Sequence, residues 1–259
     1  MNQEFIQYII LGPSSILSLI AGIVLILKGR RKLDKGMVSL GISYVLMICF
    51  FILWDVNFAS FIINYTIIYI VYMGANFFTK YTFYEKRKNK FILISTLTTL
   101  NYIILIIPKF FILFNLYVDF ILSYNGKILD NVFSITWAVI VFGWMSYASL
   151  NSYNQIKNKK IQPWVKKRLL IVTYSAFFEM FISVPDLIDI LTGRIFHDYV
   201  FYIQMIMIAT IMILQFLAWI MPKWLKKLFN HGYIIEKEID EKLSEDEIIK
   251  QLTEGEKYK

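Results

Sequence analysis

Two carboxylic acids inside one apolar stretch, TYSAFFEMFISVPDLIDI (173–190), are the residues most able to do chemistry. Glu179 follows Arg168 by 11 residues, which is about 16 Å along a helix and near the middle of a bilayer. Asp186 follows seven residues later on the same helix face. Because ionisable residues are costly inside a membrane, the pair marks a candidate site for an ion or a ligand.

The apolar stretches of the chain contain no Lys, Arg or His that could pair with Glu179. Its carboxyl group is therefore expected to be protonated, to be hydrogen-bonded to groups such as Tyr or Asn, or to bind a cation. We predict that Asn64 and Gln204 complete the site with Asp186. Pro185 is the expected hinge, because proline interrupts the helical hydrogen-bond ladder. A neutral Glu179 that only bridges two helices is an equally good interpretation.

Motifs for other chemistry are absent from the sequence. The single cysteine, Cys49, cannot form an intramolecular disulfide, and there are only two histidines. No HExxH, GxSxG, phosphate-loop or CxxC pattern occurs. We therefore expect neither a metal nor a cofactor, and the sequence does not indicate an enzyme.

The elements that must position Glu179 are long apolar runs. Of the 259 residues, 58% are hydrophobic, compared with about 45–50% in soluble domains. The runs of about 18–23 residues are long enough to cross a bilayer core as helices. We predict an all-α integral membrane protein whose residues 1–222 form a seven-helix bundle, with spans at about 5–27, 37–54, 58–78, 91–108, 132–153, 169–190 and 200–222.

Basic residues predict the orientation of these spans. The first, third and fifth connections and the segment after the seventh span carry 19 Lys and Arg residues. The N-terminus and the other connections carry only Lys109, Lys127 and Arg194. Since basic loops stay in the cytoplasm, the N-terminus is expected outside and the C-terminus inside. The net charge of +8 is thus explained by topology, and no nucleic-acid partner is expected.

Two flanking segments have local structural signals. The sequence LAWIMPKWLKKLFNHG (217–232) predicts an interfacial amphipathic helix at 223–232, with Trp219, Trp224 and Phe229 as anchors at the headgroup level. A frayed helix end with snorkelling lysines is the alternative. Residues 233–259 are expected to form a short charged cytoplasmic tail, too short for a catalytic output domain.

The fourth connection, FFILFNLYVDFILSYNGKILDN (110–131), contains the dipeptide Asn125-Gly126 between alternating residues. This pattern predicts an outer β-hairpin or folded cap. The alternative is that the fourth helix continues past Pro108 to about Phe114, with a plain turn at Asn125-Gly126.

Seven spans, an outside N-terminus and a helix after the last span resemble the plan of heptahelical receptors over about residues 5–232. An arginine motif after the third span and NPxxY in the seventh are absent, so no family is assigned. We predict a cell-membrane sensor or receptor-like protein with an outward-facing ligand or ion cavity. Its cytoplasmic partner would bind the 154–168 loop and the tail. A small secondary transporter or proton-coupled carrier and a non-catalytic accessory subunit are the alternatives, and oligomerisation is left open.

Overall fold

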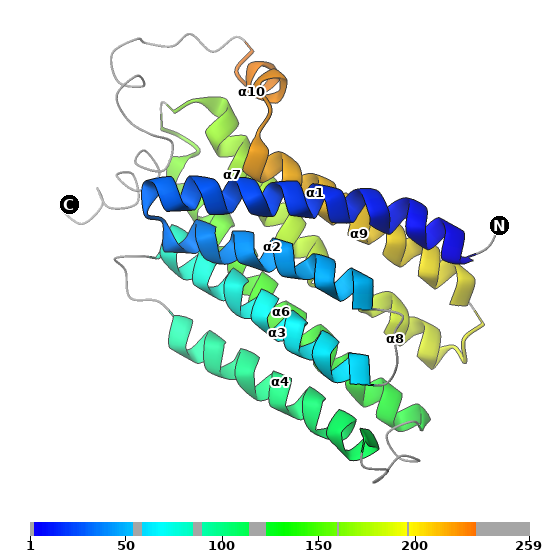
Figure 1. The fold of residues 1–259 in the computed structure, drawn as a ribbon. Helices are drawn as coiled ribbons and strands as arrows, with labels where there is room; N and C mark the ends of the chain where they lie inside the picture. The colour runs from blue at the N-terminus through cyan, green and yellow to red at the C-terminus, as the bar shows by residue number, and fades with distance from the viewer. Residues whose placement is uncertain are drawn as a thin grey trace.

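The computed structural model describes residues 3–53, 59–84, 90–113, 123–159, 161–195 and 197–231, and within them it is helical with no strand. Figure 1 shows the arrangement. The helices are α1 (Gln3–Lys32), α2 (Lys35–Leu53), α3 (Ala59–Phe83), α4 (Phe91–Leu113), α6 (Tyr124–Ile156), α7 (Pro163–Glu179), α8 (Val184–Leu191), α9 (His197–Ile220) and α10 (Lys223–Phe229).

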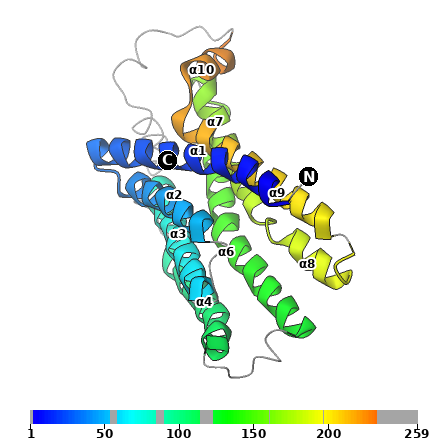
Figure 2. The same ribbon diagram turned by 45° about the vertical axis from the view of Figure 1, so that its right-hand side comes forward.

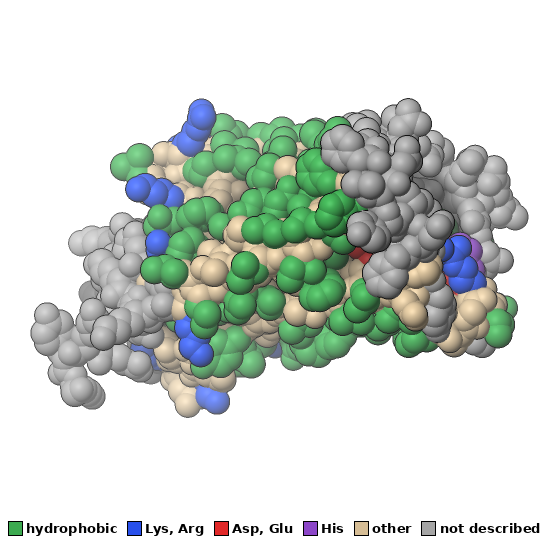
Figure 3. Space-filling model, turned by 90° about the horizontal axis from the view of Figure 1, so that it is seen from below, with side chains coloured by type: hydrophobic (Ala, Val, Ile, Leu, Met, Phe, Trp, Pro, Cys, Tyr) green, Lys and Arg blue, Asp and Glu red, His purple; other side chains and the backbone are tan. Residues whose placement is uncertain are grey.

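Six helical segments of the described chain are long and apolar enough to cross a membrane: Gly12–Lys32, Ile62–Phe83, Phe91–Phe111, Asn125–Ile156, Pro163–Leu191 and Tyr199–Ile220. The remaining predicted span, at about 37–54, corresponds to α2, whose apolar part at Lys35–Cys49 is shorter. Figure 3 shows hydrophobic side chains covering most of one flank, with Lys and Arg gathered mainly toward one end. The chain therefore has the structure of a multi-pass membrane protein.

The helices close into a ring. Figures 1 and 2 show α1, α2, α3 and α4 side by side in that order. Helix α6 packs against α3, α4 and α7, and α9 packs against both α7 and α1. Side chains from α2, α3, α6, α7 and α9 therefore meet in the interior of the ring, where a cluster of buried hydrophobic residues lies. The candidate site lies in this interior.

Small residues let α1, α2 and α3 approach closely. A Cβ atom added to Gly22 would lie 2.8 Å from the carbonyl oxygen of Gly41, and one added to Gly41 would lie 2.8 Å from that of Gly22. In the next interface, Ser43 Oγ donates a hydrogen bond to the carbonyl oxygen of Val71 over 3.2 Å. A Cβ atom on Gly74 would overlap Ser43 Oγ. Close packing of Gly and Ser is typical of helix interfaces within membranes.

We expect Gly22→Ala to destabilise the bundle by about 1 kcal/mol, because overpacking costs about 1–3 kcal/mol and alanine returns up to about 1 kcal/mol of helix propensity. Unfolding of the purified protein in detergent measures this. The matched control is Gly12→Ala in the same helix, where an added Cβ meets nothing within 4 Å. Equal stability of the two variants would contradict the close contact.

The outer β-hairpin prediction is wrong at Asn125-Gly126, because both residues lie in the first turn of α6. Ser123 occupies the N-cap position, and its Oγ accepts a hydrogen bond from the backbone N–H of Gly126 over 3.2 Å. The cap therefore satisfies the Gly126 backbone N–H, so this group does not need the partner that a hairpin turn would have given it. The alternative is confirmed for α4, which continues past Pro108 to Leu113, but its plain turn at Asn125-Gly126 is wrong, because these residues are helical. Residues 114–122 of the proposed hairpin lie outside the described residues.

Candidate functional site

The apolar stretch that carries Glu179 is interrupted directly after this residue. Helix α7 ends at Glu179, and α8 begins at Val184. In the intervening turn, the Ile182 N–H donates to the Glu179 carbonyl oxygen over 3.3 Å, an i→i−3 bond in place of the α-helical i→i−4 bond. The sequence placed the break at Pro185, which lies in the first turn of α8 and has no N–H to donate. Ser183 is the N-cap residue of α8 without a side-chain cap hydrogen bond.

The carboxyl group of Glu179 is paired with the side-chain amide of Gln215 from α9, which is hydrogen-bonded to it. Gln215 is only 4% exposed. Two acceptor atoms of this pair, Glu179 Oε2 and Gln215 Oε1, are inaccessible and have no hydrogen-bond partner among the described residues. Buried polar atoms without a partner are uncommon in proteins, so this pair requires an explanation.

Aromatic side chains line the ring interior around this pair. Tyr44 from α2 is buried, and both Tyr44 and Tyr72 from α3 lie within electrostatic reach of Glu179. The Tyr72 ring packs edge-on against the rings of Trp137 (4.8 Å between centroids) and Phe142 (5.0 Å) from α6. Glu179 therefore faces the interior of the bundle.

The side chains that the structure records near Glu179 lie on the same helices as the two partners that the sequence predicted. On α9 the partner is Gln215, 11 residues after Gln204, and on α3 the neighbouring side chain is Tyr72, eight residues after Asn64. Asn64 is buried elsewhere on α3. The period of a helix places several polar residues toward its neighbours, but the helix rotation and depth that select among them depend on packing. Gln215 and Tyr72 could be suspected from the sequence only as polar residues within apolar runs.

Asp186 belongs to a second cluster, which lies where α8 and α9 meet. The Gln204 side chain is hydrogen-bonded to the Asp186 carboxyl group, and its amide nitrogen also donates to the carbonyl oxygen of Ile182 over 3.4 Å. Buried Asp189 pairs with His197, with 2.9 Å between Oδ2 and Nδ1. Of the four residues of the predicted site, the structure therefore brings Asp186 and Gln204 together.

Trp219, predicted as an anchor at the headgroup level, is packed inside the bundle. Its side chain is 4% exposed, and its ring packs edge-on against Phe78 with 4.9 Å between centroids. Its indole N–H donates a hydrogen bond to the Tyr44 hydroxyl over 2.9 Å. The polar group of the indole therefore has a hydrogen-bond partner inside the protein.

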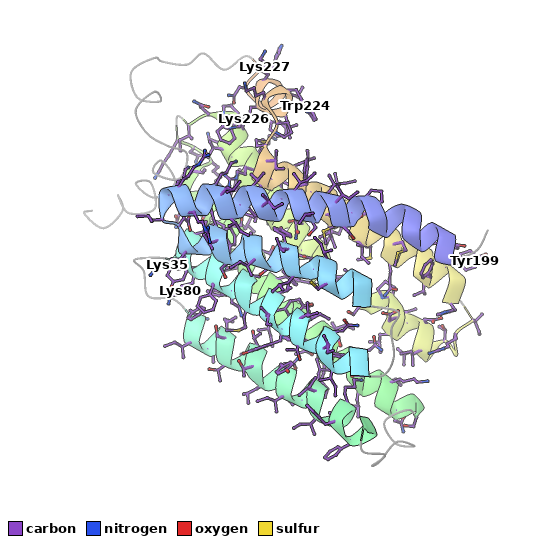
Figure 4. The ribbon with its side chains drawn as sticks, in the orientation of Figure 1. Lys35, Lys80, Tyr199, Trp224, Lys226 and Lys227 are labelled. Carbon is purple, nitrogen blue, oxygen red and sulfur yellow. The ribbon has the colours of Figure 1, made fainter. Side chains whose placement is uncertain are left out.

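Helix α10 agrees with the expected helix over Lys223–Phe229. Leu225 is buried and Phe229 packs against the core, whereas Trp224 and Leu228 are each 62% exposed. Figure 4 shows α10 with Trp224 beside the ends of α7 and α9, projecting from the side of the bundle. One edge of the helix therefore holds it to the protein and the other faces away.

Within the described residues, no group of three or more His, Cys, Asp or Glu could hold a metal ion. The chemistry available to the Glu179–Gln215 pair is therefore hydrogen bonding, proton exchange and the binding of a small cation by few ligands. No family model matches the chain, and no curated protein or solved structure matches it.

Proposed function

We propose that the protein is a multi-pass membrane sensor that binds a proton, a small cation or a small polar solute at Glu179. The observation that carries this proposal is the pair of unpartnered, inaccessible oxygens on Glu179 and Gln215. One proton shared between them, or one bound cation, would satisfy both. Their place beside an interrupted helix also supports the proposal, because sites for ions and small polar ligands recur next to such breaks.

The proposed orientation has seven spans, the N-terminus outside and the C-terminus in the cytoplasm, in the cell membrane. Figure 4 shows Lys35 and Lys80 at one end of the bundle, named here the basic end, and Tyr199 at the opposite end. The positive-inside rule assigns the basic end to the cytoplasm. The ligand would then enter from the end that carries Tyr199, and α10 would rest in the cytoplasmic interface through Trp224 and Leu228.

A sensing role is favoured because the site lies directly on the helix that leads to α10. Gln215 is five residues before the end of α9, and α10 begins at Lys223. A change at the site therefore has a short route to the basic end. The proposed cytoplasmic partner would read this change through the 154–168 loop and the tail at 233–259.

Thermal unfolding of the purified protein, measured across pH and with Na⁺, K⁺, Mg²⁺ or Ca²⁺, tests this function. We expect at least one of these conditions to stabilise the parent, because a ligand that binds only the folded state stabilises it by mass action. Glu179→Gln should lose that gain and remain folded. The matched control is Asp130→Asn, which removes a carboxylate that pairs with Lys109 over 2.7 Å elsewhere in the bundle. An identical response of Glu179→Gln and the parent would reject the site.

A proton-coupled or secondary transporter is the second candidate, and the break between α7 and α8 is the observation that favours it. A transporter moves its solute, whereas a sensor only binds it. Glu179-dependent flux of the stabilising ion or of protons into proteoliposomes would therefore replace the sensor proposal with the transporter.

A further inference from the structure

We infer that Tyr44 and Trp219 transmit the state of the Glu179 site to the basic end of the bundle, where α10 begins. This inference rests on the proposed function, since it supplies the route by which binding at Glu179 would be read. It concerns two residues that the sequence did not connect with the site.

The first step of the route is the Tyr44 hydroxyl. It accepts a hydrogen bond from Trp219 Nε1 over 2.9 Å, which leaves its own proton to be donated elsewhere. Gln215, which pairs with Glu179, lies four residues before Trp219 on the same face of α9, and both side chains are buried. Glu179 also lies within electrostatic reach of the Tyr44 hydroxyl. A negative charge on Glu179 would turn the hydroxyl proton toward itself and leave the oxygen lone pairs to the Trp219 N–H, because hydroxyl dipoles orient in the field of nearby charges. Neutralising or occupying Glu179 would weaken the bond to Trp219.

The second step is the position of Trp219 among the helices. Its ring contacts Phe78 from α3, and the Arg168 guanidinium lies over it at 5.3 Å from the ring centroid. Its carbonyl oxygen accepts a hydrogen bond from Lys28 Nζ of α1 over 3.3 Å. Together with Tyr44 from α2, these contacts join α9 to four other helices at one residue. A displacement of Trp219 would therefore shift the residues that contact it at the basic ends of α1 and α7.

The third step is the short connection from Trp219 to α10. Met221 has a backbone φ of 41°, in the left-handed region that a methionine adopts only under constraint. Pro222 follows it, and α10 is held to α7 by a hydrogen bond from the Trp164 backbone N–H to Asn230 Oδ1 over 3.2 Å. Because the surroundings hold Met221 in this conformation, a shift of Trp219 would change the conformation at Met221 and reposition α10.

The charged and polar groups around Glu179 determine which protonation events a pH titration of the protein would detect. Among the described residues, Tyr44 from α2 and Tyr72 from α3 are the titratable groups within electrostatic reach of Glu179, and Gln215 from α9 contributes an uncharged amide. From α6, Gly143 faces Met180, the next residue along the chain. A pH-dependent signal that disappears in Glu179→Gln can therefore be assigned to this site.

The test uses an environment-sensitive fluorophore on α10 of the full chain, reconstituted in phosphatidylcholine–phosphatidylglycerol nanodiscs. Cys49 is the only cysteine, so Cys49→Ser with Leu228→Cys gives one labelling position on the exposed edge of α10. In this background we expect a fluorescence transition between about pH 4 and about pH 10, a range that spans carboxyl and tyrosine titration. Glu179→Gln should abolish the transition.

Two further variants separate the route from the site. Trp219→Phe keeps the packing of a ring but removes the N–H donor, and Tyr44→Phe removes the acceptor. Both should lose the α10 transition, and Trp219→Phe, which lies outside the binding site, should keep the Glu179-dependent thermal stabilisation. The matched control is Tyr69→Phe, which removes a hydroxyl that is bonded to Thr99 of α4 over 3.1 Å, and it should behave as the parent.

The outcomes distinguish the inference from the function on which it rests. If Tyr44→Phe and Trp219→Phe retain a Glu179-dependent transition, the route is wrong and the site stands. If the parent shows Glu179-dependent thermal stabilisation and no transition at α10, the route is also wrong. If neither thermal stability nor fluorescence depends on Glu179, the proposed function fails, and the route fails with it.

Discussion

Replacing Trp219 with Ala should lower the free energy of unfolding by about 3–5 kcal/mol, the range for deleting a large buried aromatic side chain. The substitution removes the edge-on contact with Phe78 and the ring beneath Arg168. It also removes the hydrogen bond to Tyr44, which leaves a buried hydroxyl without its donor. Reversible unfolding in mixed detergent micelles, followed by far-ultraviolet circular dichroism, measures the change.

The control for this prediction is Trp224→Ala, five residues farther along the chain. Trp224 is 62% exposed, so its removal should change the free energy of unfolding by less than about 0.5 kcal/mol in detergent. Equal effects of the two substitutions would show that Trp219 is not the packed residue that the structure describes.

The Glu179–Gln215 pair should show strong coupling in a double-mutant cycle. We expect Gln215→Leu and Glu179→Leu each to cost about 1–3 kcal/mol, because each leaves a buried polar partner unsatisfied. The double variant should cost less than the two single costs added together, since replacing both members removes the unsatisfied groups together. Polar pairs in membrane proteins couple by about 0.6 kcal/mol on average and about 1.7 kcal/mol at most.

We expect a coupling energy near the upper of these values, because the paired oxygens of Glu179 and Gln215 are inaccessible. The same unfolding assay at one fixed pH, applied to the parent, both single variants and the double variant, gives the coupling energy. Costs that simply add would mean that the two side chains act independently, and the pair could then not be one binding site.

The helical, membrane-spanning character of the chain could be predicted from its apolar runs. A run of about 20 apolar residues satisfies its own backbone as a helix, and only helices or closed barrels do so in a bilayer. This is a local property, so six of the predicted spans are found close to their predicted positions. The hairpin failed because Asn125-Gly126 is a turn signal on average, whereas Ser123 is a helix cap at this position.

The candidate site was predictable only as far as Glu179 itself. A carboxylic acid within an apolar run is conspicuous in any sequence, and the break next to it was expected from Pro185, although it begins at Glu179. The identity of its partners was not predictable. Tyr44, Tyr72 and Gln215 come from three other helices and resemble many polar residues that lie along apolar runs.

Trp219 near the end of α9 and Trp224 at the start of α10 show what the sequence by itself determined and what only the tertiary structure decided. Both are tryptophans near the end of an apolar run, where interface anchors are expected, so the sequence does not distinguish them. Trp219 turns inward to Tyr44 and Phe78, and Trp224 is exposed on α10. The sequence determined that helices form and how long they are, because backbone hydrogen bonds within a helix are local. Their rotation and depth depend on how all the side chains of neighbouring helices pack, and only the tertiary structure decides this.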